Sequence, residues 1–358
     1  MTPTDGTSLG AAANIEQQPA PSDGGPTPSD DHAVASKGNR YRPVSLLDPR
    51  RLFVDNGILI VFVALFIVLQ FQSNSFATKQ NLLNLLQQNS AVGIISCAAT
   101  IVIIAGGFDL SVGATYVVGG VVAAYVAVHV SVPVGLLAGI LCGLVLGSIN
   151  GLLATKVRIS SFLATLATSL VFSGVAVAIT KGFPIAVTDP SFAKIGSGDV
   201  ASVPYPALFF IGVAVLAQLV LSQSVFGRYI FAVGGNREAA RNSGVRVDLV
   251  VFVTFAAAGL AASLGGVLDA STVATGSTNV GASLALTSIA AVALGGTSIF
   301  GGVGSVWRTV VGVLVLAMIS NGFDILGLPV YYKDIVEGGI IVIAVAANSL
   351  AVRAAARS

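Results

Sequence analysis

Charged side chains are scarce in this sequence, since Asp, Glu, Lys and Arg together account for only 9% of its 358 residues. Hydrophobic residues account for 54%, and the mean hydropathy is +0.89. Stretches without any charged side chain reach the length that crosses a bilayer, which excludes a chain of two or three soluble domains. These stretches are residues 56–78, 80–108, 110–155, 159–180, 200–227, 249–268 and 270–307.

Metal-binding residue types are equally rare. The only histidines are His32 and His129, and the only cysteines are Cys97 and Cys142, which form no Cys-x-x-Cys pair. A zinc site of the usual kind would lack ligands, so we expect no metal site. Both cysteines fall in apolar stretches, where we expect reduced core residues. The sequence has no basic block suited to nucleic acid, so we expect no such partner.

The sequence also lacks the Gly-Lys-Ser/Thr signature of a phosphate loop. The segment LGGTSIFGGVGS, residues 294–305, is rich in glycine, but this signature does not follow it. Trp307 stands where a dinucleotide-binding motif would place its last glycine. We therefore expect no cofactor in this chain and no ATP hydrolysis by phosphate-loop machinery.

Long apolar stretches of this kind predict an all-α polytopic membrane protein, because backbone amides inside lipid must be paired within their own segment. About ten transmembrane helices fit the chain, with glycine-broken segments near 106–113 and 295–304. The expected spans are 57–76, 85–105, 113–130, 132–153, 160–180, 205–222, 249–268, 285–300, 307–325 and 335–352.

The positions of Lys and Arg orient these spans, because cations favour the cytoplasmic side. With the N-terminus in the cytoplasm, only Lys79, Lys181, Lys194 and Lys333 of the 18 Lys and Arg residues fall outside. Both termini and a polar loop at 223–248 are then cytoplasmic. Residues 1–50 are rich in Pro, Ser, Gly and Asp, which predicts a disordered cytoplasmic tail before a transmembrane domain at 51–358.

Asp109 lies between two apolar stretches, in the segment AGGFDLSVGA. A carboxylate at membrane depth usually faces a cavity or a partner, and flanking glycines such as Gly113 permit a broken helix here. Two interpretations stay open. Asp109 either caps the following helix through the amides of Ser111 and Val112, or contributes to a solute path.

A second glycine break opens at Gly295 and Gly296. Its likeness to the Asp109 region hints at two related halves, which transporters often have.

Asn150 and Asn321 both occur in Asn-Gly pairs near the end of a span. Buried amides of this kind bind the hydroxyl groups of a solute or tie helices together, and the sequence leaves both interpretations open.

A polar island, GRYIFAVGGNREAARNSGVRVD, interrupts the apolar chain at residues 227–248. We expect a turn at 234–236, then a short helix over 237–242 that Asn236 caps and Gly244 ends. This helix either seats in a groove of a partner protein or belongs to an ordinary cytoplasmic loop. The candidate docking residues are Gly234, Gly235, Asn236, Glu238, Ala239, Ala240, Arg241, Ser243 and Gly244.

The largest external loop spans residues 181–204, and its Gly, Pro and Asp residues predict an irregular excursion. It is either a docking surface for an external partner or a plain connector. Its candidate docking residues are Lys181, Asp189, Lys194 and Asp199.

Taken together, these segments resemble the permease subunit of the ribose/xylose class of ABC sugar importers, a binding-protein-dependent inner membrane component. Phe108 stands where the family usually has Ile, and the N-terminal tail is not part of the resemblance. The matching segments, in the order of the family, are GGFDLSVG (106–113), NGLLATKVRISSFLATLATSLVFSG (150–174), FGRYIFAVGGNREAARNSGVRV (226–247), SIAAVALGGTSIFGGVGSVW (288–307) and NGFDILGL (321–328).

The resemblance implies a ten-helix permease of a bacterial plasma membrane, usually paired with a second copy as a homodimer. It implies import of a monosaccharide such as ribose or xylose by alternating access. A cytoplasmic ABC ATPase, which carries the ATP and magnesium, would dock on residues 227–247, and an external sugar-binding protein would deliver the solute. The chain would then be a transport subunit and not an enzyme.

Two alternatives remain at this point. One is an importer of the same architecture for amino acids or another small polar solute. The other is an ion-coupled secondary carrier, which needs titratable groups in the spans. Only Asp109, Asp269 and Asp324 are candidates for such groups.

Overall fold

The computed structural model describes residues 49–278, 281–329, 331–333, 335, 336, 338–340, 342, 343 and 346. The predicted tail up to residue 48 and much of the predicted span 335–352 lie outside the described residues. The helices are α1 (Pro49–Gln72), α2 (Lys79–Gln88), α3 (Ser90–Ile104), α4 (Val112–His129), α5 (Val132–Thr155), α6 (Ser161–Thr180), α7 (Pro190–Ser197), α8 (Tyr205–Gln223), α9 (Val225–Gly235), α10 (Arg237–Asn242), α11 (Val247–Thr272), α12 (Ala282–Leu294) and α13 (Val306–Ile325). The strands are β1 (Ile185–Ala186), β2 (Asp199–Val200), β3 (Val203–Pro204) and β4 (Thr275–Gly276).

Helices dominate the described residues, which confirms the all-α polytopic class. Six of them, α4, α5, α6, α8, α11 and α13, are long and apolar enough to cross a membrane. The pair α2 and α3, bent by 52° at its break, counts as a seventh span. Each of the first nine predicted spans corresponds to a helix or to this bent pair. Two of these helices are shorter than a full span, namely Gly57–Gln72 within α1 and Ser283–Leu294 within α12. The predicted number of about ten spans is therefore approximate.

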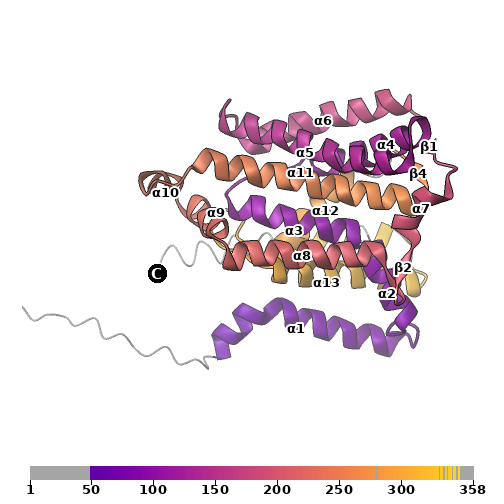
Figure 1. Cartoon of the computed structure of the whole chain (residues 1–358). Coiled ribbons are helices and arrows are strands. Elements are labelled where there is room, and N and C mark those ends of the chain that lie inside the picture. The colour runs from indigo at the N-terminus through magenta and orange to yellow at the C-terminus, as the bar shows by residue number, and fades with distance from the viewer. Residues whose placement is uncertain are drawn as a thin grey trace, which may run out of the picture. The chain divides into compact units, whose positions relative to one another are not determined.

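Helix α11 lies at the centre of the bundle and packs against α3, α4 and α5 (Figure 1). Close approach between α5 and α11 depends on glycine, because a Cβ atom on Gly143 would overlap the carbonyl oxygen of Gly259. A Cβ on Gly147 would likewise overlap the carbonyl oxygen of Phe255. Small residues let apolar helices pack backbone to backbone where lipid offers no hydrophobic driving force.

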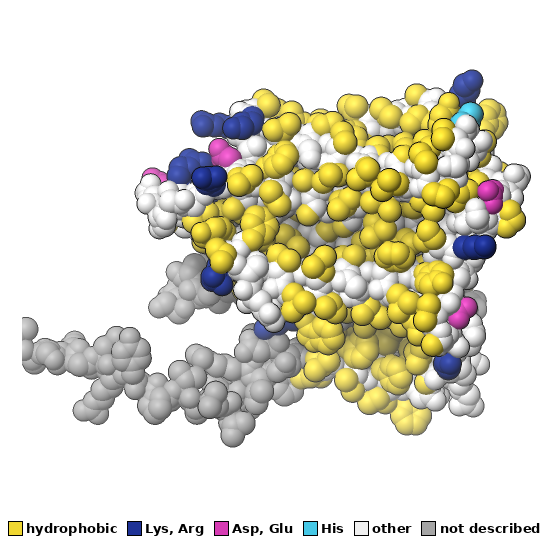
Figure 2. Space-filling model, viewed as in Figure 1, with side chains coloured by type: hydrophobic (Ala, Val, Ile, Leu, Met, Phe, Trp, Pro, Cys, Tyr) yellow, Lys and Arg dark blue, Asp and Glu magenta, His cyan; other side chains and the backbone are white. Residues whose placement is uncertain are grey.

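A belt of hydrophobic side chains covers the middle of the face in Figure 2, and Lys and Arg gather at its two ends. Leu170 of α6 is 74% exposed and Leu216 of α8 is 64% exposed, although both sit midway along their helices. Such exposure is costly in water and favourable in lipid. The described residues therefore form a multi-pass membrane bundle, with α10 at one end and α7 at the other (Figure 1).

Candidate functional site

The polar island forms two consecutive helices, α9 and α10. Asn236 caps α10, since its Oδ1 accepts a hydrogen bond from the amide of Ala239 at 2.9 Å, and Gly244 follows the helix with a φ of +83°. Both ends of the short helix predicted from the sequence are thereby confirmed. The predicted turn at 234–236 is wrong, because Gly234 and Gly235 are the last residues of α9. Packing against neighbouring backbone holds these glycines in a helical turn.

The two alanines of α10 lie on different faces of the helix. Ala240 is only 5% exposed and belongs to the hydrophobic core, whereas Ala239 is exposed. Adjacent helical positions point about 100° apart, so the two alanines, both candidate docking residues, do not share one face of α10. Ala240 therefore anchors α10. The surface left open to a partner includes Glu238, Ala239, Arg241 and Ser243.

Three segments meet backbone to backbone beneath α10. A Cβ atom on Gly234 would overlap the carbonyl oxygen of Ile104, the last residue of α3. The amide of Gly302 donates to that same oxygen at 2.9 Å. A Cβ on Gly301 would lie 3.0 Å from Cα of Gly106. Both glycine breaks thus contact the end of α9, and we call this contact the glycine junction.

The two glycine breaks end their helices in the same way. Gly106 after α3 and Gly296 after α12 both have a φ of +75°, which an L-residue with a side chain rarely adopts. In each case the glycine amide donates to the carbonyl three residues earlier, and the next amide donates to the carbonyl five residues before it. The predicted breaks near 106–113 and 295–304, and their mutual likeness, are confirmed. Gly295 packs tightly against the first turn of α13, since an added Cβ would lie 2.8 Å from the backbone of Arg308.

Asp109 begins a chain of hydrogen bonds that links the first break to α5 and α6. Its Oδ1 accepts from the amide and the hydroxyl of Ser111, at 2.9 and 2.6 Å. Asn150 of α5 donates to the Ser111 hydroxyl at 2.6 Å, and the Thr168 hydroxyl of α6 donates to the amide oxygen of Asn150 at 2.7 Å. All four side chains are buried. The amide of Ser111 is one of the two that the capping interpretation predicted, but the N-cap position of α4 is Ser111 itself, and no side chain caps that helix. Asp109 instead closes a turn immediately before α4.

Two further hydroxyl groups of α6 hold the backbone of the first break. Ser161 Oγ accepts from the amide of Phe108 at 3.1 Å, and Thr165 Oγ1 accepts from the amide of Leu110 at 3.0 Å. The sequence analysis did not single out Ser161, Thr165 or Thr168. Their spacing of four and then three residues places them on one helix face, which was the available signal.

Substitution of Asp109 separates the two interpretations of this residue. We expect Asp109→Asn to keep the fold and most of the transport activity, because Asn retains an oxygen that accepts from the Ser111 amide. Asp109→Leu removes the acceptor of the buried Ser111 amide and hydroxyl, and should lower stability by about 1–3 kcal/mol, the usual cost of a buried donor left without its partner. Thermal unfolding in detergent and solute uptake by proteoliposomes measure both effects. A folded but inactive Asp109→Asn variant would place the charge in the solute path instead.

Gly113 and Asn321, also predicted for the solute path or a helix break, lie outside this chain of hydrogen bonds. A Cβ on Gly113 would overlap the carbonyl oxygen of Gly281, so Gly113 packs α4 against the start of α12. Asn321 of α13 exchanges two hydrogen bonds with Asn81 of α2, at 2.9 and 3.0 Å. The amide of Asn321 thus ties helices together, as one of its two interpretations proposed.

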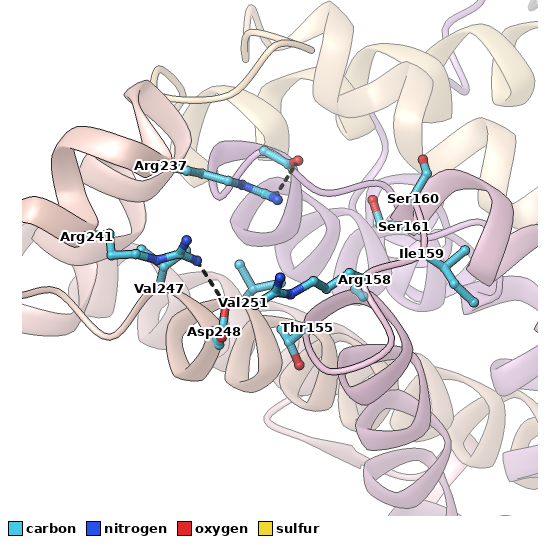
Figure 3. Close-up of a pocket in the computed structure, with 12 residues that line it drawn as sticks. Thr155, Arg158, Ile159, Ser160, Ser161, Arg237, Arg241, Val247, Asp248 and Val251 are labelled. Atoms are coloured by element: carbon cyan, nitrogen blue, oxygen red, sulfur yellow. Dashed lines mark hydrogen bonds and ion pairs between the residues drawn. The ribbon is translucent and has the colours of Figure 1, made fainter.

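A cavity of about 410 Å³ opens beside α10, between this helix, the start of α11 and the α5–α6 connection (Figure 3). Three arginines line it, Arg158, Arg237 and Arg241. Arg237 Nη2 donates to the carbonyl oxygen of Gly106 at 3.0 Å, and Arg241 pairs with Asp248 at 3.5 Å. This cationic pocket therefore touches both α10 and the first glycine break. Arg158 was not a predicted site residue.

The loop 181–204, predicted to be external, is more regular than the sequence suggested. It contains α7, and β1 pairs antiparallel with β4 through Ile185 and Gly276. Phe192 of α7 is fully buried, and Ser271 Oγ accepts from the amide of Gly196 at 2.8 Å, which fixes the helix on α11. The four predicted docking residues are all exposed: Lys181, Asp189, Lys194 and Asp199.

Local hydrogen bonds shape two of these four docking residues. Asp189 caps α7, and its bonds from Ser191 lower the pKa of its carboxyl group. Asp199 accepts from the amide of Ser202 at 3.0 Å within the β2–β3 hairpin.

An apolar helical bundle with two glycine-broken helices, a capped polar helix at one end and an ordered loop at the other is typical of a membrane permease. Residues 81–345 match the family described as the branched-chain amino acid transport system permease component. The chain belongs to this family. No solved structure matches it.

Curated relatives cover most of the chain. It is 39% identical to the ribose import permease protein RbsC of Bacillus subtilis over 81% of this chain and 91% of the relative. It is 35% identical to RbsC of Escherichia coli K12, over 80% and 91%. It is 32% identical to the L-arabinose transport system permease protein AraH of E. coli K12, over 85% and 93%. The resemblance drawn from the sequence is confirmed.

Proposed function

We propose that this chain is the membrane-spanning permease of an ATP-driven, binding-protein-dependent importer of a monosaccharide such as ribose or xylose. The names of the relatives, two ribose permeases and one arabinose permease, support a sugar and not an amino acid. An ion-coupled carrier is less favoured. The carboxyl group of Asp109 is bonded to Ser111, and that of Asp269 accepts from the Tyr116 hydroxyl at 2.6 Å.

The observation that carries this proposal is the short connection from α10 to both glycine breaks. Arg237 of α10 holds the carbonyl of Gly106, and Gly234 of α9 touches the end of α3 and the loop after α12. A movement of α10 by a partner would therefore reach α3 and α12 through the Arg237 side chain and through the main-chain contacts of Gly234. Tilting of the helices that follow the breaks, α4 and α13, would then alternate access to the solute path.

The partners follow from this role. A separate ABC ATPase, which carries the ATP and magnesium, docks on the exposed surface of α10 in the cytoplasm. An external sugar-binding protein docks on the loop that contains α7, through Lys181, Asp189, Lys194 and Asp199. A second copy of the chain completes the transporter as a homodimer. Both termini lie in the cytoplasm, and the chain itself is a transport subunit of the bacterial inner membrane.

Ala239→Arg tests the docking of the ATPase. The new side chain projects from the exposed face of α10, so we expect loss of the ATPase from the purified complex and loss of ATP-dependent sugar uptake. Ala240→Arg is unsuitable, because Ala240 is buried and an arginine there would disturb the fold. Pull-down of the purified ATPase and uptake by proteoliposomes are the measurements.

The matched control is Ala201→Arg, which makes the same change at an exposed alanine of the β2–β3 hairpin, at the other end of the bundle. It should keep the ATPase bound. Equal ATPase binding by Ala239→Arg and wild type would reject α10 as the docking site. Uptake that persists without any ATPase would reject the importer itself.

A further inference from the structure

The cationic pocket of Figure 3 is formed by residues of α10 and of a second segment of the chain. Its arginines come from two separate segments: Arg237 and Arg241 from α10, and Arg158 from the α5–α6 connection. In Figure 3 the side chain of Arg158 extends toward the α10 side, and those of Arg237 and Arg241 extend from the opposite side. Three guanidinium groups thus share one opening of about 410 Å³.

The charges in this pocket are poorly balanced. Among the described residues, Asp248 is the only carboxylate that lines the pocket. It pairs with Arg241 at 3.5 Å, and the side chains of Arg241 and Asp248 are 63% and 50% exposed. Solvent screens such a pair, so it is worth little. Within the part of the chain that the structure describes, Arg237 bonds the neutral carbonyl oxygen of Gly106 and forms no ion pair with a carboxylate. The first turn of α6, which begins at Ser161 on the pocket wall, adds a favourable dipole end for an anion.

The backbone conformation of Arg158 supports a functional role for its side chain. Its φ is +60°, in the left-handed region, where an L-residue other than Gly or Asn costs roughly 1–2 kcal/mol. A bulky cation held in this conformation at the rim of a pocket fits a functional role for the side chain, because strain of this kind concentrates at functional sites.

We propose that the cationic pocket receives an acidic side chain of the ATPase, which enters between α10 and the α5–α6 connection. This inference rests on the proposed function and extends it: the docking surface includes Arg158, more than 70 residues before α10. A carboxylate bonds arginine more strongly than a neutral carbonyl does. The incoming carboxylate therefore competes with the Gly106 carbonyl for Arg237, and it loosens the bond between α10 and the first glycine break.

Charge reversal at Arg158 tests the proposal. We expect Arg158→Glu to weaken binding of the purified cognate ATPase by about tenfold or more, because it places a like charge against the entering carboxylate. The difference from wild type should shrink as salt rises. The matched control is Lys156→Glu, an equal charge change at an exposed residue of the same connection that does not line the pocket. It should bind within about twofold of wild type.

Two additions keep the test decisive. Arg158→Asn removes the charge with a residue that tolerates positive φ, so weaker ATPase binding by this variant cannot be assigned to backbone strain. Each affinity is measured in phospholipid-free detergent and in nanodiscs that contain phosphatidylglycerol. An effect confined to the nanodiscs would assign the pocket to a lipid headgroup and overturn the proposal.

Equal losses for Arg158→Glu and Lys156→Glu would also overturn it, since general charge and not the pocket would then be responsible. The proposed function is judged separately by Ala239→Arg. If Ala239→Arg abolishes ATPase binding while Arg158→Glu and Arg158→Asn bind as wild type does, the importer role stands and only the pocket proposal fails.

Discussion

Gly234→Ala should uncouple this transporter. The new methyl group would overlap the carbonyl oxygen of Ile104 and lie 2.6 Å from the amide nitrogen of Gly302, so α9 must move away from both breaks. Overpacking against backbone typically costs about 1–3 kcal/mol, because backbone cannot rotate aside as a side chain can. We expect a lower temperature of thermal unfolding, and ATPase activity that no longer drives sugar uptake in proteoliposomes.

Gly235→Ala is the matched control for this prediction. Gly235 is the next residue of the same helix, and a Cβ placed there meets no atom within 4 Å. Alanine is favoured over glycine in a helix by about 1 kcal/mol, so this variant should be as stable as wild type or slightly more stable. Similar behaviour of the two variants would show that the glycine junction does not transmit motion.

Asn150→Ala should strongly lower the stability of the fold. Asn150 is fully buried and joins the Ser111 hydroxyl of the first break to the Thr168 hydroxyl of α6. Its removal leaves the Ser111 and Thr168 hydroxyl groups each without one partner and opens a small cavity, which together should cost about 2–3 kcal/mol. Thermal unfolding in detergent measures the loss. Ser148→Ala, a change in the same helix at a hydroxyl that bonds only its own helix backbone, should cost far less.

A double-mutant cycle isolates the bond itself. Asn150→Ala and Thr168→Val should be less destabilising together than the sum of the two single changes, by about 0.5 kcal/mol or more, because both remove the same hydrogen bond. Additive effects would mean that the two side chains contribute independently. The chain of bonds from Asp109 to α6 would then not act as a unit.

Local signals in the sequence predicted much of the site. Asn236 as cap and Gly244 as stop located α10 correctly, because these signals depend on residues within one helical turn. Glycines after apolar runs located both breaks for the same reason. The same local reasoning failed at Gly234 and Gly235. Two adjacent glycines favour a turn in isolation, and only contact with α3 and the second break keeps them helical.

The sequence could not predict which side chains are buried or which residues distant in the chain come into contact. Nothing local distinguishes Ala239 from Ala240, and the structure buries only the second. Arg158 looked like one more cytoplasmic cation until the fold placed it across a pocket from α10. The sequence analysis did not single out the hydroxyls of α6, because only the fold places them against the first break.

The sequence by itself determined that this protein is an apolar helical bundle in a membrane, with two glycine breaks and one capped polar helix. Length without charge, helix caps and positive-φ glycines act over a few residues, so they can be recognised without the fold. Only the tertiary structure decided that α9 and both breaks meet at the glycine junction, and that three arginines share one pocket. Those contacts depend on how whole helices pack, since they join residues that are far apart in the chain.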